Sequence, residues 1–551
     1  MGTLSSIQTA NQDVGNAPPG PFQDCRDCVH IALFFDGTGN NRLDDEELRK
    51  WSNVARLFFA ARDEKGLGIY RIYLSGVGTR YNASRNWGER LDSWVEDETL
   101  GNAAGLGGDR RLMGGGTQMN AALENALLQT ARSEGGKVKK IAQRMQGEGF
   151  EKMTQALGNH RLIKSINFSI FGFSRGAALA RAYTNRSANQ MTPAGANQYR
   201  YGGVPARIAF LGIFDTVASF GLPGQNWGGD EPKDLTIPPH VEACHHYVAA
   251  HEVRFSFPVD LVRDRGEYYG HVEKVYPGVH SDVGGGYEPD KQGRKDALAR
   301  MPLLHMLSAA IESGVRANSV DYLRQTNFPV AQRLIVDQVT LDAFTAYKRA
   351  CGDGGTVEAA MRRHMALYFS YRGTQHRAKV GTNSANERRL TKLRQELAQA
   401  RDAESKAEST KWREFVSGTV SSWWQARKDE GVLEDRLYAK GVELEAAEKD
   451  AQRLAASDAS VAIQAYALQR AIETGDPLVA KDGTLILVLE KQQWMLDAWH
   501  TQATPQVCDF FDNYVHDSRT DFLGGNEPFV YFRNRGIHEQ ARPRVGASGQ
   551  W

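Results

Sequence analysis

The chain contains 551 residues, of which 41% are hydrophobic and 24% are charged. These values are typical of a globular protein, and the length alone suggests about three domain-sized units. The formal net charge is +1, so no overall basic field points to a nucleic acid or to strong adsorption on an anionic membrane. No run of 18 apolar residues occurs, and we therefore predict no segment that spans a bilayer.

The N-terminal residues 1–28 are predicted to form a flexible segment. Residues 1–24 are polar and lack both the positively charged start and the apolar core of a secretory signal. The five cysteines include a single C-x-x-C pair, Cys25 and Cys28, with no second pair that would complete a zinc site or a disulfide framework. We therefore expect a protein that is made in a reducing cytoplasm without a signal peptide.

The first clear strand is expected over residues 29–35, an apolar run that opens into a turn of small residues at 36–41. A turn of this kind can offer backbone N–H groups to an oxyanion, and Gly37 and Thr38 are the candidate donors. It is not a phosphate-binding P-loop, because no Gly-Lys-Ser/Thr follows. Asp36 is a possible metal ligand, but no second carboxylate cluster at suitable spacing accompanies it.

Residues 172–176 read Gly-Phe-Ser-Arg-Gly and form the most informative motif of the chain. An apolar strand is expected before the motif, over 163–171, and a strongly helix-forming run follows at 177–183. The motif therefore lies between a strand and a helix in a sharp turn, which is the context of a nucleophile elbow. The flanking glycines let strand and helix approach closely, and Ser174 at the helix N-terminus is the candidate nucleophile.

A serine nucleophile needs a basic histidine and an orienting carboxylate, which in α/β-hydrolases follow it in the order acid, histidine. The next predicted strand, residues 206–214, ends in Asp215, at the sheet edge where ligands bind. The strand predicted after it, residues 271–276, leads into a glycine-rich loop that contains His280. Asp215 and His280 are therefore the candidate acid and base. The alternatives are a helix cap or turn residue for Asp215 and a surface-loop residue for His280.

Two other residues compete for these roles. Asp282 lies two residues after His280 and could orient a histidine or cap a turn. His516 lies near the C-terminus and could act as the base if the chain folds back. Both fit the chain order less well, because each leaves one of the two strand-end residues unused.

After the His280 loop the chain is predicted to be mostly helical. Over residues 385–473 charged, helix-forming residues dominate, which fits two long antiparallel helices with a break near 416–432. Trp423 and Trp424 fall in this break, where they suit either a bilayer interface or packing against the core. Further helices are expected over 117–132, 297–315, 341–350 and 357–371, a strand over 69–74, and an insertion rich in glycine and charge over 83–116.

Four motifs in this order resemble the first subfamily of bacterial type VI secretion lipase effectors. They are residues 34–40 (FFDGTGN), 172–177 (GFSRGA), 211–217 (LGIFDTV) and 278–287 (GVHSDVGGGY), and the C-terminal run 512–518 is also similar. The resemblance implies an α/β-hydrolase core with a catalytic triad of Ser174, Asp215 and His280. It also implies phospholipase activity, chiefly at the sn-1 ester (A1) and in some members at sn-2 (A2).

The same resemblance implies a route and two protein partners. It implies delivery on a VgrG-type spike protein, by a contractile machine, into the periplasm of a rival bacterium. It also implies a cognate immunity protein that inhibits the enzyme in the producing cell. The absence of a signal sequence is compatible with this route and equally compatible with a cytoplasmic esterase.

The predicted fold class is α/β, with an α/β-hydrolase-like, mainly parallel sheet and a largely helical accessory region. We expect a catalytic domain over 29–320, a helical accessory or lid region over 321–500, and a C-terminal segment, 501–551, that folds back on the catalytic domain. The backbone N–H groups of Arg175 and of Gly37 or Thr38 would bind the oxyanion, and this chemistry needs no metal or other cofactor. The alternatives are a soluble carboxylesterase or thioesterase, and a non-catalytic delivery or adaptor protein that kept the fold.

Overall fold

The computed structural model describes residues 28–79, 108–134, 136–157, 162–218, 234–254, 256–381, 384–417, 420–475, 492–520 and 531–539. The predicted N-terminal segment up to residue 27, Cys25, and most of the predicted insertion over 83–116 lie outside the described residues.

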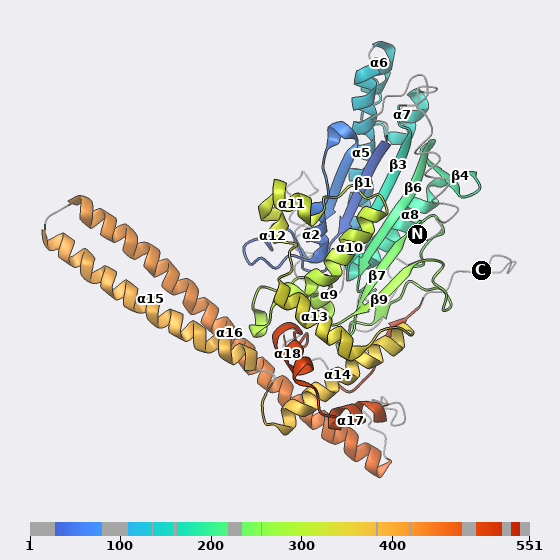
Figure 1. The fold of residues 1–551 in the computed structure, drawn as a ribbon. Helices are drawn as coiled ribbons and strands as arrows, with labels where there is room; N and C mark the ends of the chain where they lie inside the picture. The colour runs from blue at the N-terminus through green and yellow to red at the C-terminus, as the bar shows by residue number, and fades with distance from the viewer. Residues whose placement is uncertain are drawn as a thin grey trace.

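The core of the fold is a mainly parallel β-sheet with helices on both faces (Figure 1). Its parallel strands follow the order β2, β1, β3, β6, β7, β9, and an antiparallel hairpin, β4–β5, pairs with the start of β6. The strands of this sheet are β1 (Cys28–Phe35), β2 (Ile69–Leu74), β3 (Ser165–Phe173), β4 (Met191–Gly195), β5 (Gln198–Tyr201), β6 (Val204–Phe214), β7 (Cys244–Ala249) and β9 (Val272–Tyr276). This architecture confirms the predicted α/β fold class.

Both faces of the central strands are buried, because successive side chains alternate between two hydrophobic clusters. Phe34 and Phe171 belong to the cluster covered by α2 (Asn53–Ala60) and α10 (Arg300–Glu312). Phe35 and Ile170 belong to the opposite cluster, covered by α5 (Gly108–Glu134) and α8 (Arg175–Asn189). The sheet is therefore held between two layers of helices, and only its edges and strand ends are available for a site.

Strand β7 and the β4–β5 hairpin were not predicted. Strand β7 lies between β6 and β9, so the two strands that precede Asp215 and His280 are not direct neighbours. Its sequence, Cys-His-His-Tyr-Val-Ala, contains two adjacent histidines and gives no clear alternation. The hairpin is mostly exposed in β4 and contains Pro193, so it also lacks a hydrophobic period.

A helical region packs next to the end of the sheet where the short helix α9 (His280–Gly284) lies (Figure 1). It comprises α13 (Gln338–Cys351), α14 (Val357–Arg377), α17 (Gln493–His500) and α18 (Pro505–Tyr514). Smaller elements are η1 (Lys65–Leu67), α6 (Gly136–Arg144), α7 (Phe150–Leu157), η3 (Lys291–Gly293), η4 (Asp296–Ala299), α11 (Val320–Thr326) and α12 (Phe328–Gln332).

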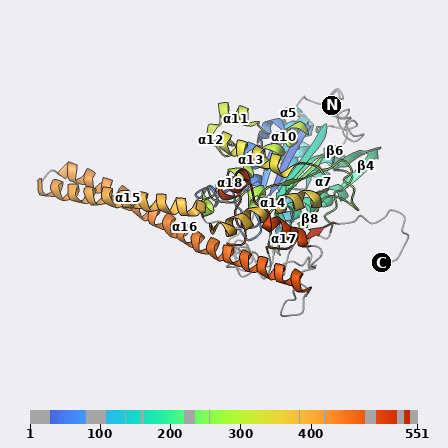
Figure 2. The same cartoon turned by 60° about the horizontal axis from the view of Figure 1, so that its bottom comes forward.

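Two long helices, α15 (Ser384–Ser417) and α16 (Val420–Thr474), form a hairpin that projects from the body (Figures 1 and 2). The predicted break over 416–432 was too wide, because α16 already begins at Val420. Trp423 and Trp424 therefore lie within α16 and not in the break. Residues such as Gln425 and Arg427 are good helix formers, and they continue the helix despite the small residues before them. Among the described residues, no helix has the length and apolar character needed to cross a membrane.

The C-terminal segment reaches the sheet end near α9. Helix α18 contacts α13 and α14, and the short strand β10 (Ile537–His538) pairs in parallel with β8 (Val259–Asp260). Residues from the last part of the chain are therefore held beside loops that follow β6 and β7.

Candidate active site

Ser174 occupies the sharp turn between β3 and α8. Its backbone has φ 58° and ψ −128°, a conformation that non-glycine residues rarely adopt and that is typical of a nucleophile elbow. The Ser174 N–H donates to the carbonyl oxygen of Phe214, the residue before Asp215, at 3.0 Å. The elbow and the end of β6 are thereby joined at one edge of the sheet.

The two glycines of the motif are required by close backbone contacts. A Cβ atom at Gly172 would lie 2.5 Å from the carbonyl oxygen of Gly176, and one at Gly176 would lie 2.2 Å from that of Asp36. Real Cβ atoms do not approach backbone oxygens so closely. The helix therefore begins directly against the loop that follows β1, and this places the elbow beside the candidate oxyanion residues.

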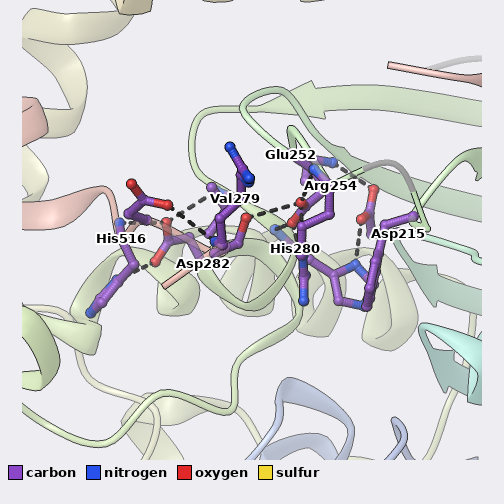
Figure 3. Close-up of polar contacts among 12 residues, drawn as sticks. Asp215, Glu252, Arg254, Val279, His280, Asp282 and His516 are labelled. Carbon is purple, nitrogen blue, oxygen red and sulfur yellow. Dashed lines mark hydrogen bonds and ion pairs between the residues drawn. The ribbon is translucent and has the colours of Figure 1, made fainter. Parts of the chain in front are cut away.

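His280 and Asp215 form a buried pair. Their Nδ1 and Oδ2 atoms are 2.5 Å apart, and their side chains are 5% and 0% exposed (Figure 3). His280 is the first residue of α9 and not part of an extended loop, which corrects the prediction for its surroundings. The His280 ring also packs on Phe173, the residue before Ser174, with ring centroids 4.6 Å apart. The structure thus brings together the three residues that the strand order selects.

The serine and histidine side chains are not hydrogen-bonded to each other: within the described residues, the His280 ring bonds Asp215 alone. In structures without substrate, catalytic hydrogen bonds of this kind are often long and tighten only in the complex. Burial lowers the pKa of His280 below its ordinary value, although the hydrogen bond and charge of Asp215 act in the opposite direction. Burial thus favours the neutral form of the ring, which is the state a general base requires.

Asp215 receives four hydrogen bonds. Besides His280, the Ala249 N–H donates at 2.8 Å, and the guanidinium of Arg535 donates to both carboxylate oxygens at 2.7 and 2.8 Å. Burial alone would raise the pKa of Asp215, but the charge of Arg535 and the hydrogen bond from His280 outweigh it and hold the pKa below its usual range. Sequence reasoning missed Arg535, which lies in no motif and is 320 residues from Asp215.

A second ion pair borders His280 (Figure 3). The Glu252 carboxylate accepts from the backbone N–H of His280 at 3.2 Å, from Ser518 Oγ at 2.9 Å and from the guanidinium of Arg254. Burial opposes its ionisation, yet Arg254 lowers the pKa of Glu252 to about 2. The Glu252 carboxylate thereby fixes the backbone of the histidine.

The rival residues Asp282 and His516 bond each other, on the side of His280 away from Asp215 (Figure 3). His516 Nδ1 lies 2.6 Å from Asp282 Oδ1, and the other Asp282 oxygen accepts from the backbone N–H groups of Val279 and His516. The His516 ring stacks on Tyr287, with centroids 3.9 Å apart. Asp282 thus ties the C-terminal segment to the turn that precedes His280.

The candidate oxyanion loop is organised by Asp36. Its Oδ1 accepts from the Gly37 N–H at 2.7 Å and its Oδ2 from the Tyr73 hydroxyl at 2.5 Å. The Gly37 N–H is therefore already engaged by Asp36. The Thr38 side chain has a buried Oγ1 with no hydrogen-bond partner among the described residues. Burial raises the pKa of Asp36 to about 6, against hydrogen bonds from Ser52, Tyr73 and Gly37. In the part of the chain that the structure describes, no group of three or more acidic, histidine or cysteine side chains has the arrangement of a metal site.

An elbow serine and a buried His–Asp pair at the same edge of a mainly parallel sheet are typical of the α/β-hydrolase class. Residues 183–309 match a family model described as "T6SS, Phospholipase effector Tle1-like, catalytic domain". The match confirms the resemblance to type VI secretion phospholipase effectors that the motifs indicate. It includes Asp215 and His280 and begins after Ser174.

The solved structures similar to the chain include the following two. An uncharacterized protein from Pseudomonas aeruginosa is 24% identical, with a TM-score of 0.63, and the alignment covers 97% of this chain and 81% of that one. This likeness concerns the fold. The Tle1 effector bound to the VgrG spike from the Type 6 secretion system is 19% identical, with a TM-score of 0.36, and the alignment covers 61% of this chain and 83% of that one. No curated protein gives a significant match.

Proposed function

We propose that the protein is a serine phospholipase A that hydrolyses glycerophospholipid esters, at sn-1 and in part at sn-2, and acts in the periplasm of a target bacterium. The observation that carries the proposal is the His280–Asp215 pair, 2.5 Å apart and packed on the residue before an elbow serine. The matched family of phospholipase effectors supports the choice of a lipid ester as the substrate.

In the proposed mechanism, Ser174 Oγ attacks the ester carbonyl while His280 Nε2 takes its proton. Asp215 holds the Nδ1–H tautomer and stabilises the imidazolium. The oxyanion accepts hydrogen bonds from the backbone N–H groups of Arg175 and Thr38, with Gly37 available only if Asp36 releases it. His280 then protonates the leaving lysophospholipid, and a water molecule activated by the same ring hydrolyses the acyl-enzyme.

The direct test is fatty acid release from vesicles of phosphatidylethanolamine and phosphatidylglycerol. Ser174→Ala should lower turnover by about 10³-fold or more, and Ser308→Ala, an exposed serine on α10, is the matched control. Hydrolysis of short soluble esters without hydrolysis of vesicles would favour the soluble esterase. Wild-type activity on both substrates that does not exceed the background of Ser174→Ala would leave only a binding or delivery role.

The proposed site of action requires delivery, and we propose that a VgrG-type spike carries the protein and that a cognate immunity protein protects the producer. The family match to secreted effectors supports this route. Expression with an added periplasmic export signal should be far more toxic than cytoplasmic expression, and the toxicity should require Ser174. Equal toxicity from both compartments would contradict a periplasmic target.

We further propose that the tip of the α15–α16 hairpin contacts the bilayer. The side chains of Trp412, Phe415 and Trp424 are 60%, 60% and 59% exposed, and Trp423 packs between Phe415 and Trp424. Arg427 lies over both tryptophan rings. Exposed tryptophans with adjacent cationic side chains suit the headgroup region of a membrane. The end of the hairpin where α15 meets α16 lies away from the sheet (Figure 2).

A further inference from the structure

Arg535 makes a contact with the candidate triad that the elbow motif does not anticipate. Its guanidinium donates to both oxygens of Asp215, and its side chain is 4% exposed. We propose that Arg535 is a positioning residue that keeps the Asp215–His280 pair in its unprotonated, base-competent state. The C-terminal segment would then be part of the active site. This inference rests on the proposed hydrolase function.

The charge of the fully buried Asp215 carboxylate requires compensation. Asp215 is 0% exposed, and an isolated carboxylate in such surroundings is strongly disfavoured relative to its protonated form. The two parallel N–H···O bonds from Arg535 are the strongest compensation that a side chain can offer. The neutral His280 ring and the Ala249 N–H donate one hydrogen bond each but bring no charge.

Removal of Arg535 should therefore favour proton uptake by the pair. The proton would settle either on Asp215 or on His280 as an imidazolium–carboxylate pair, and the two sites titrate as one system. In either case, His280 can no longer accept the proton of Ser174. The pH below which the enzyme loses activity should rise, whichever atom carries the proton.

The other charged groups around the pair do not replace Arg535. Glu252 and Arg254 neutralise each other beside His280. Four further titratable side chains accept hydrogen bonds from the adjoining backbone. His246 accepts from the Thr216 N–H and pairs with Glu273. Asp260, His251 and Asp282 accept from the N–H groups of Ala218, Gly278 and Val279, respectively. None of these side chains donates a charged hydrogen bond to Asp215, so Arg535 alone among them compensates the charge of this carboxylate.

A purely structural role is the alternative. Arg535 also donates to the carbonyl oxygens of Phe257 and Ala249, and the same segment is anchored by Glu539, which bonds Arg263 and the Gly266 N–H. Glu539→Gln is therefore a matched control: it weakens the anchorage of the segment without touching Asp215.

The first experiment measures the pH profile of kcat/KM on a soluble short-chain ester for wild type, Arg535→Met, Arg535→Lys and Glu539→Gln. For Arg535→Met we expect the acid limb to move up by about one to three pH units and the rate near pH 7 to fall by about tenfold or more. Arg535→Lys keeps the charge and should lie between Arg535→Met and wild type. Glu539→Gln should keep the wild-type limb. The proposal would be overturned if Arg535→Met kept the acid limb at the wild-type pH, or if Glu539→Gln moved it as far as Arg535→Met does.

Chemical rescue adds a readout that a structural role would not move. Arg535 lines a cavity of about 510 Å³ together with Glu252, Met361 and Trp494, so a small cation can enter the space that Arg535→Ala leaves. Millimolar guanidinium should restore activity to Arg535→Ala, whereas urea, which has a similar shape and no charge, should not. Equal effects of the two compounds would argue against a role for the charge.

A titration independent of turnover separates this inference from the proposed function. In the Ser174→Ala background, NMR of labelled histidine reports proton uptake at His280 with and without Arg535→Met. If the wild type hydrolyses no ester yet Arg535→Met still raises the pH of proton uptake, the proposed function fails and the role of Arg535 stands. If esters are hydrolysed and the titration does not move, the role of Arg535 fails alone.

Discussion

The assignment of the base can be tested by removing His280 and His516 in turn, since each is a buried histidine that bonds an aspartate. His280 stacks on Phe173 beside the elbow, whereas His516 stacks on Tyr287 and bonds Asp282 on the other side of α9. We expect His280→Ala to lower kcat by about 10³-fold or more, which corresponds to about 4 kcal/mol of transition-state stabilisation. The fold should persist, because Asp215 keeps the donors Ala249 and Arg535.

His516→Ala should have the opposite profile. It removes a buried hydrogen bond to Asp282 and a stacked ring, which together contribute about 2–4 kcal/mol to the free energy of unfolding. The backbone N–H groups of His516 and Val279 still bond Asp282, so kcat should stay within about tenfold of wild type. The assays are kcat on a soluble ester and urea unfolding at the same pH. Near-normal turnover of His280→Ala combined with loss of turnover in His516→Ala would refute the assignment.

Three further outcomes follow from the geometry. Gly176→Ala should destabilise the protein by about 3 kcal/mol in urea unfolding and abolish activity, since the new Cβ would lie 2.2 Å from the Asp36 carbonyl oxygen. The control Gly441→Ala on α16, where nothing lies within 4 Å of the new Cβ, should stabilise the protein by about 1 kcal/mol. Dialysis against a chelator should leave most activity in place, because both Asp36 oxygens are engaged by Gly37 and Tyr73; activity that is lost and then restored by calcium would reveal a metal site. Replacing Trp423 and Trp424 with alanine should impair vesicle hydrolysis about tenfold and soluble ester hydrolysis less than about twofold. The control is Tyr438→Ala, because Tyr438 is 77% exposed on the same helix, and this change should affect neither activity. Equal losses on both substrates would contradict membrane contact.

The elbow could be predicted because all its determinants lie within about twenty neighbouring residues. The apolar run of β3, the two glycines and the alanine-rich start of α8 each favour the same local structure, and local agreement of this kind makes a prediction reliable. The end of β6 could be placed because a buried parallel strand has an apolar sequence. Strand β9 is a half-exposed edge strand with the sequence Val-Glu-Lys-Val-Tyr, and only its β-branched and aromatic residues before a Pro-Gly turn indicated it. The chain order after β9 indicated His280 as the candidate base, but the sequence did not predict its first-turn position in α9.

The unpredicted parts depend on contacts between distant segments. Strand β7 carries His246, which is polar in sequence but buried in the sheet because Glu273 and the Thr216 N–H satisfy both of its ring nitrogens. Composition and periodicity cannot reveal such a partner. The β4–β5 hairpin lacks a buried face and so leaves no periodic signal.

The support of the candidate triad is distributed over the whole chain, so the sequence motifs indicate its candidate members but not the residues that hold them. Ser174, Asp215 and His280 follow three strands of one sheet. The groups that fix them come largely from after residue 500: Arg535 on Asp215, Ser518 on Glu252 and His516 on Asp282. Each of these groups compensates a buried carboxylate, and an uncompensated carboxylate at any of the three positions would cost more than the loss of an ordinary hydrogen bond. The C-terminal segment is therefore expected to be as intolerant of charge-changing substitutions as the elbow itself, even though no catalytic motif passes through Arg535.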